Sequence, residues 1–303
     1  MTLQFGTAPA PEPGIYYDVP DAEYRTWNLP SQSTLSMFRN RDLCELDVHY
    51  RLINPIESTP QMQLGNQLEL AVDDPDNIGG NIQPLPKEIK ARRGLAWETF
   101  REQNPDITYL PKTDWDKHKV QVEQLKAMAT QVNLVAGALL KDAKRQVSFV
   151  ADMVFVGEDG NNATHRVKGR LDYLDESEKL ILDLKSTFAG GPRAVGRSMW
   201  TFGYDIQSAL YTDAMEQLLD TELKFLFVVC RTSAPYPVTV YDGHNTTEMA
   251  GQFRDIGRRS YQIYLERLAE CVGQNRWRGY YSPTDPDDLI LDIELPSWAG
   301  TDF

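Results

Sequence analysis

The sequence is poor in the residues that build disulfide frameworks and metal knuckles. Its 303 residues include only three cysteines, Cys44, Cys230 and Cys271, which lie far apart in the chain. A disulfide framework or a zinc knuckle needs paired, suitably spaced cysteines, and the four histidines show no metal-site spacing either. The composition therefore predicts a protein of a reducing compartment that carries no structural zinc.

Long apolar runs and an excess of positive charge are also missing. No stretch approaches the roughly 18 uninterrupted apolar residues that a membrane span requires, and residues 1–14 lack the basic and apolar regions of a secretory signal. We therefore expect a cytoplasmic protein with no membrane partner. The formal net charge of −13 argues against a protein that coats nucleic acid. An enzyme can still gather its positive charge in one cleft, because the local field matters more than the sum.

What the sequence does contain is a change of hydrophobic period near residue 145. Residues 1–30 are rich in proline and acid and predict an extended arm, and helical patterns follow, including a helix over about 112–141 that breaks near 131–133. After about residue 145, the spacing of the apolar residues predicts strands and helices. The strands are expected over 146–156, 166–174, 179–187, 222–231 and 237–241, and the helices over 196–219 and 246–272.

This order predicts an α/β (α+β) fold in which a mixed central β-sheet is flanked by helices. After the arm, we expect a single domain over residues 31–303. Its helical part would be residues 31–144, and its catalytic core residues 145–303.

The chemistry is concentrated in two of the predicted strands, which carry Gly169-Arg170-Leu171-Asp172 and Ile181-Leu182-Asp183-Leu184-Lys185. Side chains alternate along a strand, so Asp183 and Lys185 are expected on one face. Asp172 and Asp183 can share a hard cation such as Mg²⁺, with the Leu184 carbonyl as a further oxygen ligand. Lys185 would then lie near an attacking water and stabilise developing negative charge. Solvated surface charges are the alternative for so short a motif.

The helix predicted after these strands carries Tyr204, Gln207 and Tyr211 on one face, at i, i+3 and i+7. A glutamine at the end of the sheet can orient the lysine or contact a phosphate, and the tyrosines can stack on DNA or simply cap the core. Residues 166–197 hold seven basic and five acidic residues, which predicts a locally positive cleft. Arg193 and Arg197 are the candidates there to follow a DNA backbone.

Together these runs resemble the PD-(D/E)xK nucleases, and more narrowly the RecE-type (exodeoxyribonuclease VIII-like) phage recombination exonucleases. The resemblance rests on Gly169 to Asp172, on Asp183-Leu184-Lys185 and on the run from Gly203 to Tyr211. It extends to three outlying segments. These are Ser31-x-Ser33, the run from Arg92-Arg93-Gly94 through Phe100 to Asn104-Pro105, and Leu295-Pro296-Ser297-Trp298-Ala299.

The resemblance also implies a metal ligand upstream, where the family has a histidine in a Gly-x-x-x-His helix. The matching stretch runs from Gly65 to Glu69, so a carboxylate replaces the imidazole. Glu69, Asp172 and Asp183 would then bind Mg²⁺, for which Mn²⁺ could substitute, because carboxylates suit hard cations.

The activity that the resemblance implies is 5′→3′ exonucleolytic degradation of linear double-stranded DNA, leaving 3′ single-stranded overhangs for recombination by strand annealing. It also implies a homo-oligomeric ring, a single-strand annealing protein as partner, and a phage or prophage gene in a bacterial host. Arg39 and Arg41 are candidates to bind a terminal 5′-phosphate, because arginine grips phosphate bidentately; two solvated arginines are the alternative.

Other functions remain open at this point. A Cas4- or RecB-like single-strand nuclease would usually hold an iron–sulfur cluster with four cysteines, and the sequence has three. A catalytically inactive scaffold that binds DNA ends is another alternative. It would apply if Glu69, in place of the expected histidine, does not preserve an active metal site. A glycosidase pair of Asp172 and Asp183 is disfavoured by the neighbouring Lys185.

Overall fold

The computed structural model describes residues 8–40, 42–54, 59–78, 80, 82–86, 88–89, 93–104, 107–157, 160–243 and 251–280. The first part of the chain contains β1 (Gly14–Tyr16), α1 (Asp21–Thr26), α2 (Gln32–Ser36), η1 (Met37–Arg39), α3 (Glu45–Ile53), α4 (Pro60–Asp73), η2 (Pro75–Asn77), β2 (Ile82–Pro84), α5 (Leu95–Gln103), β3 (Thr108–Leu110) and α6 (Lys112–Leu139). The second part contains β4 (Lys144–Val156), β5 (Asn162–Asp175), β6 (Leu180–Thr187), α7 (Pro192–Thr201), α8 (Tyr204–Leu219), β7 (Lys224–Arg231), β8 (Val238–Asp242) and α9 (Gly251–Gln274).

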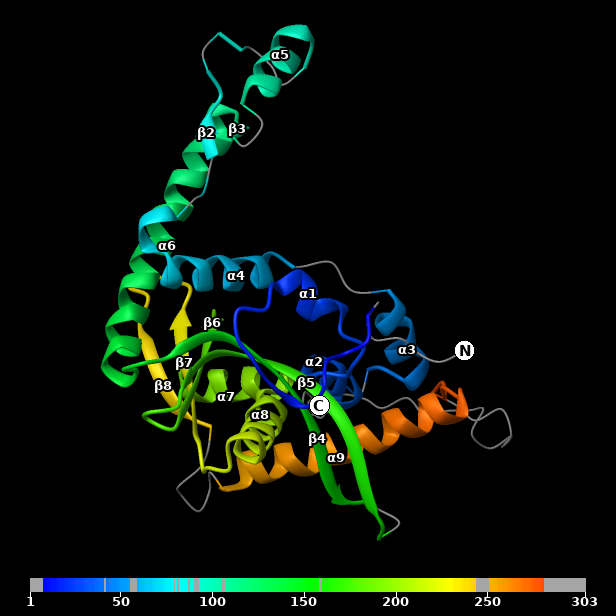
Figure 1. Cartoon of the computed structure of the whole chain (residues 1–303). Coiled ribbons are helices and arrows are strands. Elements are labelled where there is room, and N and C mark those ends of the chain that lie inside the picture. Colours follow the sequence, from blue (N-terminus) through cyan, green and yellow to red (C-terminus); the bar gives the residue numbers. More distant parts are fainter. Residues whose placement is uncertain are drawn as a thin grey trace, which may run out of the picture.

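A six-stranded sheet of order β1-β4-β5-β6-β7-β8 forms the centre of the molecule (Figure 1). Only β6 and β7 run parallel to each other; the other neighbours are antiparallel. Helices cover both faces of this sheet, so the mixed α/β sheet flanked by helices is confirmed. No helix in the described ranges is long and apolar enough to cross a membrane.

Each face of the sheet has its own apolar core. On one face, the core side chains include Phe149, Ile181 and Phe225, which face α8 and α9. On the other face, Leu182 packs with Leu68 of α4 and with side chains of α6. Adjacent residues of β6 thus enter opposite cores, as the period of two requires. The two layers hold β6 between them, and β6 carries three of the predicted site residues, Asp183, Leu184 and Lys185.

The helix predicted over 196–219 is two helices, α7 and α8, which separate at Gly203. Gly203 has φ +68°, a conformation that favours glycine, and a Cβ there would lie 2.4 Å from Oγ of Ser36. Gln32 Nε2 also donates to the Gly203 carbonyl at 2.9 Å. Helix α2, whose N-cap is Ser31, therefore packs against this break.

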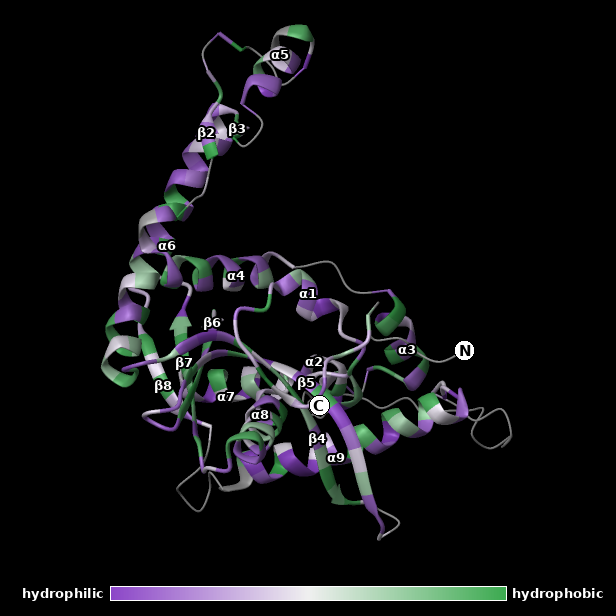
Figure 2. Ribbon diagram, viewed as in Figure 1, coloured by the Kyte–Doolittle hydropathy of each residue, from purple (hydrophilic) through white to green (hydrophobic). Residues whose placement is uncertain are grey.

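The break predicted near residues 131–133 is absent, and α6 is continuous from Lys112 to Leu139. Val132 is buried in the core, and Asn133 Nδ2 donates to the carbonyl of Val72 at 3.2 Å, so both side chains are accommodated within the helix. The first half of α6 projects from the body beside β2, β3 and α5 (Figure 1). This projecting half carries interleaved hydrophilic and hydrophobic residues (Figure 2).

Within the predicted N-terminal arm, residues 8–30 differ from an extended chain. They contain β1, which pairs with β4, and the short helix α1. Trp27 is buried, and the rings of Tyr16 and Tyr24 each meet it edge-on at 5.5 Å. The aromatic residues scattered among the prolines supply the contacts that order this segment.

Candidate active site

The predicted site lies where β5 and β6 part. Their ladder runs only from Asp175↔Leu180 to Tyr173↔Leu182, after which β6 continues beside β7 alone. Just beyond the last pair, the Leu184 amide donates to Oδ2 of Asp172 at 2.7 Å. A strand residue directs its N–H and C=O toward the same side. The Leu184 carbonyl therefore also points into the gap between the strands.

Asp183 and Lys185 lie on the opposite side of β6 from Leu182 and Leu184, toward α8. Gln207 Nε2 of α8 donates to Oδ1 of Asp183 at 2.6 Å, and Lys185 Nζ lies 2.5 Å from Oδ2. Oδ2 is buried with the Lys185 ammonium as its charged partner, and beyond this ion pair no other donor in the described residues reaches it. Such an atom is costly to bury unless something else binds it.

Helix α4 brings Glu69 to the same place. Its carboxyl shares a hydrogen bond with Asp172. One turn earlier, a Cβ added at Gly65 would lie 3.5 Å from Oγ of Ser186, in ordinary contact. The helix therefore lies directly against β6, and Glu69 joins the two aspartates from a separate element of the fold.

The electrostatics of the three acids reflect crowding in a buried place. Burial, reinforced by the charges of Asp183 and Glu69, holds the pKa of Asp172 well above its usual range. Burial also raises the pKa of Asp183 and of Glu69, although Lys185 opposes both shifts. Burial would lower the pKa of Lys185, but the Asp183 charge outweighs it and the pKa is raised. Lys185 is therefore charged, beside acids whose ionisation burial opposes and a bound cation would favour.

The donor set fits a hard divalent cation. In the described part of the chain, no group of three or more His, Cys, Asp or Glu side chains is already arranged to hold a metal ion. The available donors are nevertheless carboxylate and carbonyl oxygens, which suit Mg²⁺ and Mn²⁺. The buried Oδ2 of Asp183, whose one partner among these residues is the Lys185 ammonium, is one such donor.

A small cavity adjoins the cluster between β6 and α7. Its volume is about 20 Å³, and Lys185, Phe202 and Tyr204 are among its lining residues. This is room for one water, which needs about 10–15 Å³ by the same measure. The ammonium of Lys185 also lies 4.8 Å from the centre of the Tyr204 ring, and this ring stacks on Phe227.

The structure corrects the expectation that Tyr211 contacts DNA. Its side chain lies in the core, with its ring edge-on to Phe149 at 5.3 Å, and burial raises its pKa. The same packing explains Gly169, where a Cβ would lie 2.2 Å from the Phe149 ring. The glycine of the predicted motif thus leaves room for an aromatic pair beneath the site.

Arg39 is likewise neither a free phosphate ligand nor a solvated arginine. Its guanidinium is buried, pairs bidentately with Asp205, donates to Ser260 at 3.0 Å and lies 4.1 Å over the Trp200 ring. It therefore joins η1 to α7, α8 and α9. Arg41 lies outside the described residues, as does the run from Leu295 to Ala299.

Arg193 and Arg197 are exposed on α7, beyond the small cavity. Their position leaves them accessible to a bound polymer, and their contact with DNA stays a prediction.

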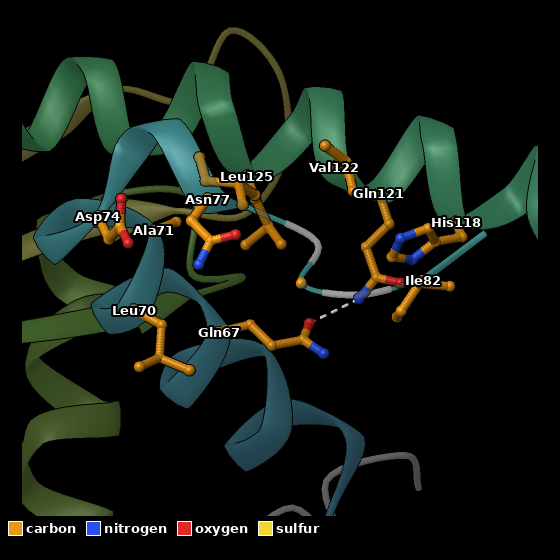
Figure 3. Close-up of a pocket in the computed structure, with 12 residues that line it drawn as sticks. Gln67, Leu70, Ala71, Asp74, Asn77, Ile82, His118, Gln121, Val122 and Leu125 are labelled. Carbon is orange, nitrogen blue, oxygen red and sulfur yellow. Dashed lines mark hydrogen bonds between the residues drawn. The ribbon is translucent and has the colours of Figure 1, made fainter. Parts of the chain in front are cut away.

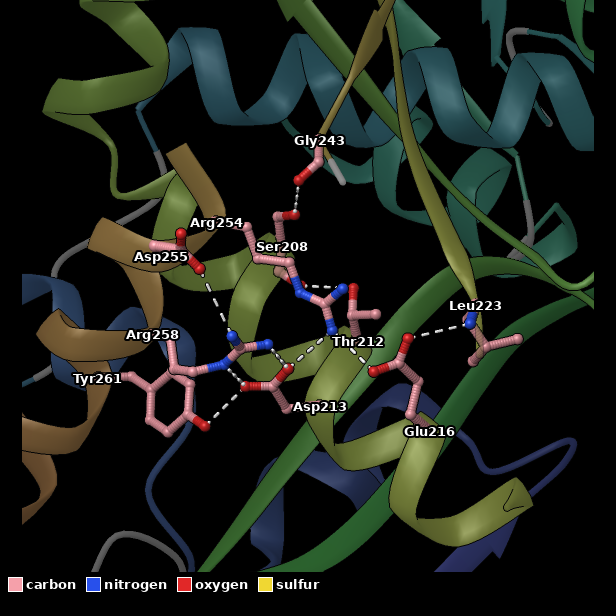
Figure 4. Close-up of polar contacts among 10 residues, drawn as sticks. All are labelled: Ser208, Thr212, Asp213, Glu216, Leu223, Gly243, Arg254, Asp255, Arg258 and Tyr261. Carbon is pink, nitrogen blue, oxygen red and sulfur yellow. Dashed lines mark hydrogen bonds and ion pairs between the residues drawn. The ribbon is translucent and has the colours of Figure 1, made fainter. Parts of the chain in front are cut away.

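A polar network fixes α8 against α9 (Figure 4). Asp213 accepts from both Arg254 and Arg258, at 2.8 and 2.6 Å, and from the Tyr261 hydroxyl at 2.8 Å. This network anchors the helix that carries Gln207, and its members are too far apart in sequence to be paired by pattern.

A second, larger cavity of about 370 Å³ lies between α4 and α6 (Figure 3). Gln121 Nε2 donates to Oε1 of Gln67 across it at 2.6 Å, and Leu70 and Leu125 line it. The cavity's lining includes none of the three acids. It belongs to the junction with the projecting half of α6.

Residues 96–281, more than half of the chain, match the family of PDDEXK-like domains of unknown function (DUF3799). The chain belongs to this family. The matched part of this PDDEXK-like domain spans Asp172, Asp183, Lys185 and Gln207 and begins after Glu69.

Comparison of this PDDEXK-like domain with solved structures finds one with the same fold and others that are less similar. A proposed exonuclease from Eubacterium rectale has a TM-score of 0.53 at 12% sequence identity, covering 89% of this chain and 91% of that chain. A phage-related exonuclease from Haemophilus somnus 129PT is less similar, with a TM-score of 0.27 at 13% identity over 79% of this chain and 94% of that one. No curated protein sequence matches the chain. At these identities, the Eubacterium rectale structure establishes the fold alone.

Proposed function

We propose that this protein is a metal-dependent DNA exonuclease, a hydrolase of phosphodiester bonds. The observation that carries the proposal is the convergence of Asp172, Asp183 and Lys185 at the point where β5 and β6 part. An acid pair beside a permanent cation suits phosphodiester hydrolysis, which needs charge neutralisation on phosphate oxygens and a positioned water.

The residues that would hold the metal are Glu69, Asp172 and Asp183, with the carbonyl of Leu184. When bound, Mg²⁺, or Mn²⁺ in its place, would neutralise phosphate oxygens and lower the pKa of a water. Gln207 would fix the orientation of Asp183 through its 2.6 Å hydrogen bond.

Lys185 has two roles in this proposal. Its raised pKa keeps the ammonium charged, and the small cavity beside it has room for one water. In hydrolysis, the water oxygen bonds to phosphorus, the ester P–O bond breaks and the leaving oxygen takes a proton. The Lys185 ammonium can hold the water and offset the charge that develops on the phosphate.

The finer assignment rests on the resemblance to the RecE-type exonucleases. It supports 5′→3′ degradation of linear double-stranded DNA to leave 3′ overhangs for annealing, a ring of identical subunits and a partner annealing protein in a bacterial cytoplasm. The description of the Eubacterium rectale structure as a proposed exonuclease supports the exonuclease activity alone. Within this proposal, residues 31–303 act as one nuclease domain.

A catalytically inactive DNA-end-binding scaffold is the second candidate. The observation in its favour is that a carboxylate, Glu69, lies beside Asp172 where the resemblance expects a histidine, so that its charge opposes that of Asp172. This function would retain end binding and lose hydrolysis.

The test uses purified protein with Mg²⁺ and two forms of one duplex, covalently closed circular and linear with a labelled 5′ end. We expect loss of the linear form alone, early release of the 5′ label as mononucleotide, arrest by EDTA and recovery on adding Mg²⁺. Cutting of the circle would indicate an endonuclease. DNA-end binding without hydrolysis in Mg²⁺ or Mn²⁺ would favour the scaffold, and robust hydrolysis without metal would contradict the metal site.

A further inference from the structure

Three cationic side chains form a row along one face of β5, and Asp172 follows them in the same strand. Arg166, Lys168 and Arg170 alternate with Val167, Gly169 and Leu171. Val167 and Leu171 lie in the core on the α8 side of the sheet, and Gly169 faces Phe149 on that side. The cations therefore lie on the opposite face, which α4 also covers. The row is about 13 Å long, which is the rise of about four base pairs along the axis of duplex DNA.

The N-terminal segment, residues 8–30, covers this row. Lys168 Nζ donates to the carbonyls of Tyr24 and Trp27 at 3.0 and 2.7 Å. Arg170 donates to the carbonyl of Val19 at 2.9 Å and lies 3.4 Å from a carboxylate oxygen of Asp21. The Tyr24 ring lies over both cations, 4.4 Å from the Arg170 guanidinium and 4.8 Å from the Lys168 ammonium.

The first cation of the row is held in the same way. Arg166 pairs with Glu12 of the N-terminal segment at 3.3 Å, besides its pair with Asp152 of β4. All three cations thus bind oxygen atoms of one acidic segment.

The charges in this cover are incompletely balanced. Lys168 is only 6% exposed, and in the described residues it forms no ion pair with a carboxylate. Burial, together with the charges of Arg25 and Arg170, lowers the pKa of Lys168 to about 8. Asp21, in contrast, is 60% exposed, so its pair with Arg170 contributes little. A polyanion with several phosphates can therefore compete for the row.

We propose that Arg166, Lys168 and Arg170 form a binding track for the DNA phosphate backbone, and that residues 8–30 cover this track until DNA displaces them. The inference rests on the proposed function, because it places the track beside the nuclease site. The cover acts as an internal competitor: it keeps the cations from binding other anions and lowers the affinity of the free protein for DNA.

Binding of a labelled linear duplex to the full chain in EDTA, followed by fluorescence anisotropy over a range of salt concentrations, tests the track without hydrolysis. Tyr24→Ala loosens the cover and should tighten binding by about fivefold, whereas Asp21→Asn, which removes only an exposed pair, should change binding little. Arg170→Gln should weaken binding, reduce the salt slope by about 1 and abolish the gain in the double variant with Tyr24→Ala. Tyr50→Ala, at an exposed tyrosine of α3 outside the cover, and Glu23→Gln, within the segment, are the controls.

Hydrogen exchange provides a second measurement on the unmodified protein. Saturating duplex should accelerate exchange of the α1 amides, including the Tyr24 amide, which donates to the Pro20 carbonyl at 3.0 Å. Unchanged exchange, or equal affinities for Tyr24→Ala and Tyr50→Ala, with normal degradation of linear DNA, would overturn this inference alone. Absence of both DNA binding and hydrolysis in the wild-type protein would overturn the proposed function as well.

Discussion

The amide of Leu184 donates to the carboxylate of Asp172 across the point where β5 and β6 separate. The alternation of β5 shifts here, because Leu171 packs on the α8 side of the sheet whereas Tyr173 packs on the α4 side. Asp172 thus turns toward the neighbouring strand and satisfies an amide that the ladder leaves unpaired. The same bond holds the carboxylate beside Asp183, so the strand separation itself builds the site.

Asp183→Asn and Lys185→Met test the centre of the proposed mechanism. Each variant keeps the shape of the side chain and removes its charge, so we expect hydrolysis of linear duplex to fall by about 10³-fold. Melting curves should show that both variants fold. Lys179→Met, an exposed lysine at the β5–β6 turn, is the control. Wild-type turnover by either site variant would refute the assigned roles.

Glu69→Ala tests the third proposed ligand. We expect the Mg²⁺ concentration for half-maximal activity to rise by at least about tenfold, because one carboxylate oxygen is lost from the site. Glu69→His should recover part of the activity, with a preference shifted toward Mn²⁺, since imidazole suits softer cations. Asn66→Ala, exposed on the same helix, is the control. If Glu69→Ala degrades DNA like the parent at limiting Mg²⁺, the assignment of Glu69 is wrong.

Gln207→Leu tests a positioning role. The variant removes the donor to Oδ1 of Asp183, and we expect kcat to fall by about tenfold, which corresponds to about 1.4 kcal/mol. The Mg²⁺ requirement should rise while KM for DNA stays unchanged, a pattern that mere destabilisation would not produce. Gln217→Leu, near the other end of α8, is the control. An unchanged Mg²⁺ requirement would indicate that Gln207 only packs.

The central strands could be predicted from sequence because each buries one or both faces. The spacing of Asp172, Asp183 and Lys185 then brings them together through alternation and pairing alone. The helix break at Gly203 could not be predicted, since Gly196 lies inside α7 without breaking it. The difference is a tertiary contact: Ser36 leaves no space for a side chain at Gly203.

The sequence also does not show which group a single arginine binds. Arg39 could bind a phosphate or a carboxylate, and its partner Asp205 lies 166 residues away. The cover on β5 depends on similar long-range contacts, between residues 8–30 and residues 166–170. The i, i+2 spacing of Arg166, Lys168 and Arg170 signals a common face, but not which group occupies it.

Arg39→Ala should act on stability and not on DNA binding. Removing the guanidinium leaves Asp205 buried without its cation, which costs about 3–5 kcal/mol, measurable by urea denaturation. The folded fraction should bind duplex with wild-type affinity. Arg259→Ala, exposed on α9, is expected to change stability by less than about 0.5 kcal/mol. Weakened DNA binding by fully folded Arg39→Ala would indicate that Arg39 contributes to the DNA interface.

Asp175 should make stability depend on pH. Burial alone would raise its pKa, but donors from Ser177 and from the amides of Lys141, Asp142 and Glu178 outweigh it, so its pKa lies well below the ordinary 3.8. A lowered pKa in the folded state stabilises the protein above the unfolded pKa, and this contribution is lost as pH falls below about 4.

The comparison of wild type with Asp175→Asn isolates this contribution. At pH 7 the variant should be about 2–3 kcal/mol less stable, because the amide replaces a charged acceptor, and the difference should shrink steadily between about pH 4 and pH 2. Urea denaturation across this range measures it, with Asp220→Asn, exposed at the end of α8, as the control. A difference that stays constant down to pH 2 would mean that the donors recognise the shape of the side chain and not its charge.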